Sequence, residues 1–172
     1  MKNIIFIALA LLVFSSCQQE KKIAFIDNGT VINDYQEKKD LEARFETKSN
    51  AFQKRKDSLI GAYQIELKDA QLKAQRMSQS KLQKLSQEIQ QKEQLLGQKI
   101  QFEQQQIQQE FQTEIDSVIA KVKSFIKDYG KNNGYTYILG TSDAAATVLY
   151  GTEENDLTQT VLDALNDTYK KE

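Results

Sequence analysis

The sequence predicts an α+β fold, in which a long antiparallel α-helical coiled-coil hairpin stands on a small β-sheet base. One observation is a stretch of about a hundred residues without Pro, with apolar residues at steps of three and four. The other is a short β-rich run on each side of that stretch. Such a small sheet has open edges, so we expect other copies of the chain to complete the base.

Residues 1–16 are predicted to be a lipoprotein signal peptide. A short basic start precedes Ile4–Phe14, an apolar run that is too short to cross a bilayer, which takes about 20 residues. Its length is typical of the apolar part of an export signal. The small residues Ser15 and Ser16 then precede Cys17, the only cysteine of the chain.

Cys17 is the predicted site of lipid attachment. The stretch before it resembles the bacterial lipobox, whose cysteine receives two or three acyl chains, and residues 17–22 would form the lipidated end and its linker. This predicts a periplasmic protein held by lipid. Gln18 is not the Asp that retains lipoproteins in the inner membrane, which favours the inner leaflet of the outer membrane. The alternative is an ordinary signal peptide with an incidental cysteine.

The body of the protein, residues 23–172, begins with a predicted strand over 23–27 and continues with two long helices. Strong helix formers dominate both, and we expect the helices over 31–78 and 81–132. A single helix of that total length has no partner for its apolar seam, whereas two antiparallel helices supply one for each other. The turn between them is predicted near Met77–Lys81.

The last part of the chain changes from helical to β periodicity. Two β-rich runs, with Gly140 and other turn residues between them, predict a β-hairpin over 135–150, and a helix is predicted over 156–167. Each chain would then offer three short strands. Three chains would bring nine, enough to close a barrel, which takes about eight. This argues for an oligomer and leaves its copy number open.

Several classes of function are excluded by what the sequence lacks. There is no His, one cysteine cannot build a thiolate metal site, and no phosphate-binding GxxxxGK[ST] loop is present. The net charge of −1 provides no basic field for nucleic acid. We therefore expect no catalysis, no cofactor, no metal and no nucleic-acid partner.

The two ends of the body resemble the Skp (OmpH) family of periplasmic chaperones. The similar segments are "KKIAFIDNGTVINDYQEKKDLEARFE" and "KDYGKNNGYTYILGTSDAAATVLYGTEENDLTQTVLDALN". The resemblance implies a homotrimer with a nine-stranded barrel at its base and three helical arms around a cavity. In that cavity the family holds unfolded outer-membrane proteins without ATP and prevents their aggregation. Unlike well-known members, this chain is slightly acidic and carries the features of a lipoprotein.

The tip of the arm is a candidate functional site. It is predicted to be basic and would attract acidic clients or anionic headgroups; its residues are Lys73, Arg76, Met77, Lys81 and Lys84. The alternative is a solvated helix end. Fourteen of the 34 residues from Gln79 to Gln112 are Gln, which suits either weak client contacts or simple solvation.

Gly61 and Gly97 are predicted to lie level with each other, because folding the chain about residue 79 places them at the same height. Two glycines at one level would make a hinge. The alternative is that small residues are tolerated where the helices approach closely. For the whole protein, the competing function is a structural coiled-coil lipoprotein that acts as a spacer or tether in the envelope.

Overall fold

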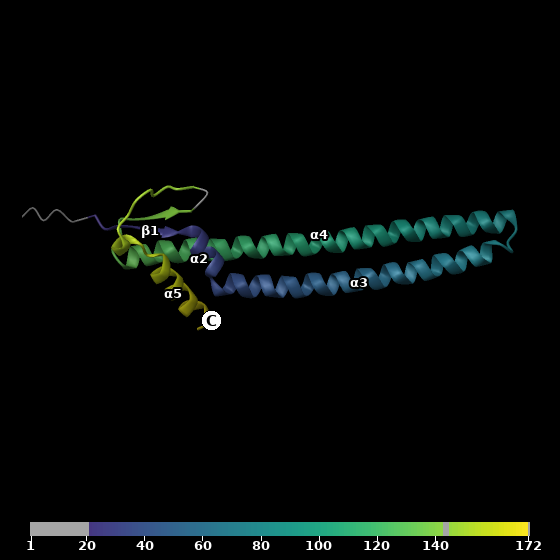
Figure 1. The fold of residues 1–172 in the computed structure, drawn as a ribbon, viewed down its shortest axis with the longest axis horizontal. Helices are drawn as coiled ribbons and strands as arrows, with labels where there is room; N and C mark the ends of the chain where they lie inside the picture. Colours follow the sequence, from purple (N-terminus) through teal and green to yellow (C-terminus); the bar gives the residue numbers. More distant parts are fainter. Residues whose placement is uncertain (1–20, 143–144, 172) are drawn as a thin grey trace, which may run out of the picture.

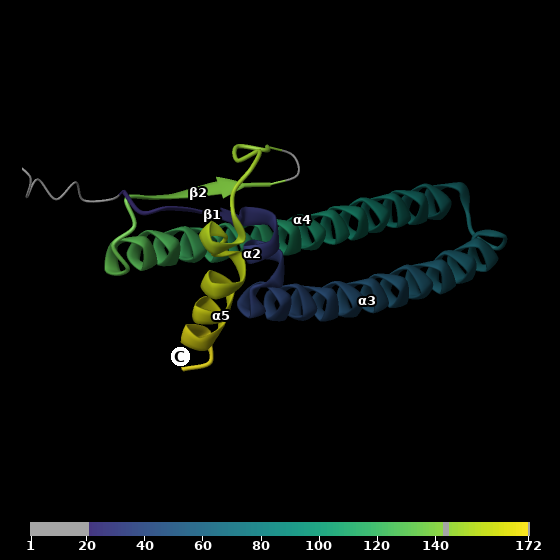
Figure 2. The same cartoon turned by 60° about the vertical axis from the view of Figure 1, so that its left-hand side comes forward.

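The computed structural model describes residues 21–142 and 145–171. Its elements are β1 (Ile23–Asp27), α2 (Asn28–Asp34), α3 (Gln36–Ala74), α4 (Gln79–Asn132), β2 (Tyr137–Thr141), the 3-10 turn η1 (Glu153–Asn155) and α5 (Thr158–Tyr169). Figures 1 and 2 show the predicted architecture: α3 and α4 form a long antiparallel hairpin, and the strands, α2 and α5 gather at one end of it. We call the hairpin the arm and the other elements the base.

The first helix is divided at Tyr35, where the sequence predicted one helix over 31–78. Tyr35 has an extended backbone, and its side chain is buried against the edge of the Tyr169 ring. The Asn166 side chain on α5 accepts a hydrogen bond from the Gln36 N–H at 2.8 Å. The bend therefore forms because α5, at the far end of the chain, holds this point and caps α3.

The predicted β-hairpin over 135–150 is wrong. β2 pairs in parallel with β1, from Ile23 opposite Tyr137 to Asp27 opposite Thr141, so the whole arm is the crossover between the two strands. Gly140 is part of β2 and not of a turn. The missing Cβ there leaves room for the Asn28 side chain, which a larger residue would force to move.

The run that follows β2 contains no strand in the described residues 145–150. Leu149 and Tyr150 are 90% and 86% exposed. The outer edge of β1 is covered instead by the chain just before α5: the Leu157 N–H donates to the Phe25 carbonyl at 2.9 Å. Within residues 21–142 and 145–171, one chain therefore supplies two strands to the base, and not the three that the sequence predicted.

The hydrophobic core lies in the base and extends into the first part of the arm. Ile26, Val31, Val122 and Val161 are almost completely buried there, and each comes from a different element. Farther along the arm the seam is mostly half-buried. In the part of the chain that the structure describes, no helix is both long and apolar enough to cross a membrane.

The seam of the arm repeats every eleven residues. On α4 it recurs at Leu85, Leu96, Ile107, Val118 and Tyr129, all of them buried or half-buried. Eleven residues make three turns at 3.67 residues per turn, close to the natural α-helical value, so the two helices need little supercoiling to stay in contact.

Ion pairs between the two helices follow the same repeat. Arg44, Arg55 and Glu66 of α3 pair with Glu114, Glu103 and Lys92 of α4, and Lys48 and Glu37 pair with Glu110 and Lys121. Eleven residues forward along α3 always correspond to eleven backward along α4. The pairs are largely exposed, so each adds little stability, but together they favour one register.

Candidate functional site

The tip of the arm is a four-residue turn, Gln75–Ser78, that joins α3 to α4. The helices end and begin a few residues earlier than predicted: α3 stops at Ala74 and α4 starts at Gln79. The N–H of Arg76 donates to the Lys73 carbonyl at 3.1 Å. The main chain thus closes the turn itself, which explains why no Gly or Pro marks it in the sequence.

The structure brings the five predicted tip residues together. Lys73 lies in the last turn of α3, Arg76 and Met77 lie in the turn, and Lys81 and Lys84 lie at the start of α4. The four cations are exposed and Met77 is half-buried. Their arrangement gives the end of the arm a positive charge.

Only one of the tip cations is paired with an acidic group in the described part of the chain. Lys73 Nζ lies 2.5 Å from Asp69 Oδ2, and this hydrogen bond, with the charge of Asp69, raises the pKa of Lys73. Arg76, Lys81 and Lys84 have no ion pair among the described residues. These three side chains can therefore meet an anionic group of another molecule.

The arm also exposes large apolar side chains that the sequence analysis did not identify. They are Ile65, Leu72, Leu82, Leu95 and Phe102, with exposed fractions between 38% and 74%. The sequence could have revealed them, because these apolar residues fall outside the eleven-residue seam that packs against the other helix of the arm. Leu72 and Leu82 lie beside the cations of the tip, which makes that end both basic and apolar.

Gly61 and Gly97 lie level with each other, as the register of the ion pairs requires. Gly61 follows Arg55 by six residues, and Gly97 precedes Glu103, the partner of Arg55, by six. A Cβ added at either glycine would meet nothing within 4 Å. Close approach of the helices therefore does not explain these glycines, and the hinge stays a prediction.

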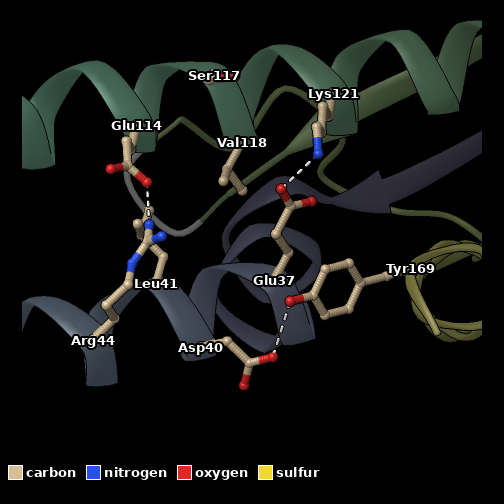
Figure 3. Close-up of a pocket in the computed structure, with 9 residues that line it drawn as sticks. All are labelled: Glu37, Asp40, Leu41, Arg44, Glu114, Ser117, Val118, Lys121 and Tyr169. Carbon is tan, nitrogen blue, oxygen red and sulfur yellow. Dashed lines mark hydrogen bonds and ion pairs between the residues drawn. The ribbon is translucent and has the colours of Figure 1, made fainter. Parts of the chain in front are cut away.

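A cleft of about 410 Å³ lies where α5 meets the two helices of the arm (Figure 3). Its charged groups are paired with one another: Glu37 with Lys121 at 2.6 Å, and Arg44 with Glu114. The hydroxyl of Tyr169 donates to Asp40 at 3.1 Å. The two ion pairs join α3 to α4, and the Tyr169 hydrogen bond attaches α5 to α3, so the cleft is best explained as a structural junction.

Cys17, the predicted lipid attachment site, lies outside the described residues. The structure does describe Lys22, close to the end of the predicted linker. Its amino group lies 3.3 Å from the Asn133 carbonyl and 4.0 Å from the centre of the Tyr135 ring. The chain therefore enters the base beside the end of α4 that is remote from the tip.

Comparison with models of known protein families identifies a family with this sequence pattern. The family model described as outer membrane protein (OmpH-like) matches residues 22–165, which is most of the chain. The chain belongs to the OmpH-like family. The match takes in both helices of the arm and all but the last residues of α5, so the OmpH-like region and the described fold coincide.

A solved structure has the same fold as this OmpH-like chain. It is the crystal structure of an OmpH-like protein from Caulobacter crescentus CB15, described as a candidate outer membrane chaperone. The two share 17% sequence identity with a TM-score of 0.75, over 86% of this chain and 85% of the other. No match was found among curated proteins.

Proposed function

We propose that this OmpH-like protein is an ATP-independent periplasmic holdase, which binds unfolded outer-membrane proteins and keeps them from aggregating. The observation that carries the proposal is the arm. It extends far beyond the core and exposes five large apolar side chains along its length. At its tip lie three cations that have no ion pair with any residue that the structure describes. Family membership and the likeness to an OmpH-like candidate chaperone support this proposal.

The proposed mechanism is the summation of weak contacts. The exposed side chains are spread along both helices, so each covers only a small part of a client. An unfolded chain that touches several of them at once is held by their combined effect, since the first contact raises the local concentration for the next. Loss of single contacts allows release, and no nucleotide is required. We expect no catalytic activity, cofactor or metal.

The proposed assembly is a homotrimer in which three arms surround the client. Its support is the apolar surface around β2, where Tyr137 and Leu139 are 57% and 40% exposed and Leu149 and Tyr150 are more so. A sheet edge and an apolar segment of this kind are stabilised by burial against other chains. The barrel proposed for the base would form from such contacts.

The proposed membrane attachment is through Cys17, at the inner leaflet of the outer membrane. Residues 18–22 reach at most about 17 Å when extended. Lys22 lies at the end of the base remote from the tip, which supports an orientation with the base at the membrane and the arms in the periplasm. Fluorescent labels should then place residue 79 far from lipid and residue 22 close to it. The reverse pattern would overturn this orientation.

The experiment that tests the holdase uses the purified chain from residue 18 onward and an outer-membrane protein diluted from urea. We expect the chain to suppress light scattering by the client at a near-stoichiometric ratio without ATP. Replacing Ile65, Leu72 and Phe102 by Ser should weaken the suppression. The matched control replaces Ser58, Ser80 and Ser86 on the same helices by Ala. If the chain does not suppress the aggregation of several different clients, the proposal is wrong.

A structural envelope tether is the competing function. Photocrosslinking in cells from residue 79 separates the two, because a holdase captures many outer-membrane proteins whereas a tether captures the cell wall or one fixed partner.

A further inference from the structure

α4 carries a straight stripe of ten glutamines along its surface. They follow one another at steps of four, four and three residues, the same eleven-residue period as the seam: Gln79, Gln83, Gln87, Gln90, Gln94, Gln98, Gln101, Gln105, Gln109 and Gln112. We call these ten residues the glutamine stripe. Because its period equals that of the seam, the stripe does not wind around the arm.

The glutamine stripe lies on the side of α4 that faces away from α3. Gln90, Gln101 and Gln112 each come five residues after a seam residue, which places them on the far side of a helix with 3.6 residues per turn. All ten side chains are exposed. In Figures 1 and 2, α3 is the one element alongside this part of α4 among the described residues.

Most amide groups of the stripe have no hydrogen bond to another side chain within the described part of the chain. Elsewhere in the chain a Gln side chain donates to an Asp four residues later, as Gln53 does to Asp57 and Gln159 to Asp163. From Gln79 to Gln109, no stripe residue has an acidic residue four positions ahead. Among the described residues, only Gln112 of the stripe has a side-chain hydrogen bond, to Asp116 at 3.0 Å. Keeping a helix soluble requires polar residues on its surface, but it does not require glutamines at regular steps of four, four and three.

Two exposed apolar side chains border the stripe. Leu95 comes three residues before Gln98 and Phe102 four residues after it, so both lie next to Gln98 on the helix surface. Their exposed fractions are 64% and 62%. The nearby charges Lys92 and Glu103 are directed to α3, where they pair with Glu66 and Arg55. Lys99 lies next to both apolar residues, four positions after Leu95 and three before Phe102. Glu93 lies three positions after Gln90. The stripe itself is uncharged, and its borders combine apolar side chains with these charges.

We propose that the glutamine stripe binds the main chain of an unfolded polypeptide in extended conformation. Each Gln offers a donor and an acceptor, as does each residue of a polypeptide main chain, so binding needs neither charge nor a particular sequence. Leu95 and Phe102 would contact apolar side chains of the same segment. The inference rests on the proposed holdase function and assigns the contact that recognises clients of unrelated sequence.

The length of the stripe fits this occupant. From Gln79 to Gln112 the helix rises about 50 Å at 1.5 Å per residue. A transmembrane β-strand of about 9–11 residues spans about 30–36 Å when extended. One arm can therefore hold a complete strand of an outer-membrane protein in an extended form, with its main-chain groups hydrogen-bonded and unavailable to other unfolded chains.

The test compares two quadruple variants of the purified chain. The stripe variant replaces Gln87, Gln90, Gln94 and Gln98 by Ala. The control variant replaces Gln91, Gln104, Gln106 and Gln108 by Ala, which are the four glutamines of the same region outside the stripe. Ala favours helix at least as well as Gln, so both variants should keep their helical circular dichroism.

The probe is a labelled synthetic peptide with the alternating pattern of a transmembrane strand, together with a version N-methylated at every second residue. We expect the stripe variant to bind the unmodified peptide about tenfold more weakly than the wild type, and the control variant to bind as the wild type does. N-methylation removes main-chain donors. It should weaken binding to the wild type and have little further effect on the stripe variant.

The outcomes separate this inference from the proposed function. If the wild type suppresses client aggregation and the stripe variant binds the peptide equally well, the holdase stands and the inference is wrong. Equal loss of binding in both quadruple variants also overturns it, because position on the stripe would then not matter. Dextran serves as a second probe. If the stripe variant loses binding to dextran but not to the peptide, the stripe binds glycans and the inference is wrong. A wild type that binds no client overturns both proposals.

Discussion

At the scale of single residues, Asn166 has a role that reaches across the chain. Its side chain caps the start of α3 although it lies 130 residues away on α5. Next to it, Tyr35 and Tyr169 pack edge to face with ring centres 5.9 Å apart. These contacts determine where the arm leaves the base, so residues at the far end of the chain set the direction of the arm.

Replacing Asn166 by Ala should destabilise the chain by about 1 kcal/mol, because the Gln36 N–H loses its acceptor at a helix start. The free energy of unfolding in urea measures the change. Asn166→Asp, which keeps the acceptor, should retain most of the stability. Asn155→Ala is a matched control, since that side chain bonds only to the nearby Thr152. An equal loss in Asn155→Ala and Asn166→Ala would contradict the capping role.

The contact between Tyr169 and Asp40 predicts a dependence of stability on alkaline pH. The hydrogen bond to Asp40, with burial and the charge of that carboxylate, raises the pKa of Tyr169 above its ordinary 10.0. The folded state thus holds the phenol proton more tightly than the unfolded chain does. The contact stabilises the fold below pH 10 and this contribution is lost as the pH rises through the raised pKa.

Urea unfolding at a series of pH values from 8 to 11 measures this effect. Tyr169→Phe cannot lose the proton and should show a flatter decline in stability over the upper part of that range. If the wild type and Tyr169→Phe decline in parallel, Tyr169 does not contribute to the pH dependence.

At the scale of elements, the two helices of the arm illustrate what local sequence can specify. The strand over 23–27 and the long helices follow from residue preference and periodicity, which are local properties. The division at Tyr35 does not, because Tyr35 and its neighbours look helical by themselves and only the contact with α5 bends the chain. The glutamine stripe was visible only as a high Gln content until the structure defined the eleven-residue seam.

Alanine at the two level glycines of the arm should stabilise it. Gly61→Ala and Gly97→Ala should each add about 0.5–1 kcal/mol, because Gly is unfavourable inside a helix and no atom obstructs the new Cβ. Amide hydrogen exchange at the tip should slow if the glycines form a hinge. Gly130→Ala is the control: a Cβ there would lie 3.1 Å from Ile138 Cδ1, so no comparable gain is expected. Unchanged exchange at the tip would argue against a hinge.

At the scale of the whole molecule, the base is the part for which the sequence-based prediction, a β-hairpin over 135–150, was wrong. Gly140 and its neighbours have the composition of a turn, yet they continue β2, because they pair with Ile26 and Asp27 of β1. Pairing between β1 and β2 depends on residues more than a hundred positions apart. Contacts over such a distance leave no local pattern. The five tip residues could be placed together because the seams of the two helices determine the register.

The exposed segment after β2 predicts an effect on assembly. Replacing Leu149 and Tyr150 by Ser should shift the protein from the proposed trimer toward monomer, measured by sedimentation equilibrium, while its helical content stays the same. The matched control replaces Leu95 and Phe102 by Ser, which are also apolar and exposed, at 64% and 62%, but lie on the arm. A wild type that sediments as a monomer would contradict the proposed trimer.

The parallel pairing of β1 with β2 has a consequence for the order of folding. The arm can form from residues close in sequence, starting at the tip turn, whereas β1 must wait until β2, more than a hundred residues later, is available. Slow, long-range closure of the base follows rapid, local formation of the arm. If the chain, proposed above to be periplasmic, is exported unfolded, the newly arrived protein spends time as an arm without a base, with the edge of β1 unpaired and open to other chains. During that interval the proposed chaperone would itself need protection from aggregation.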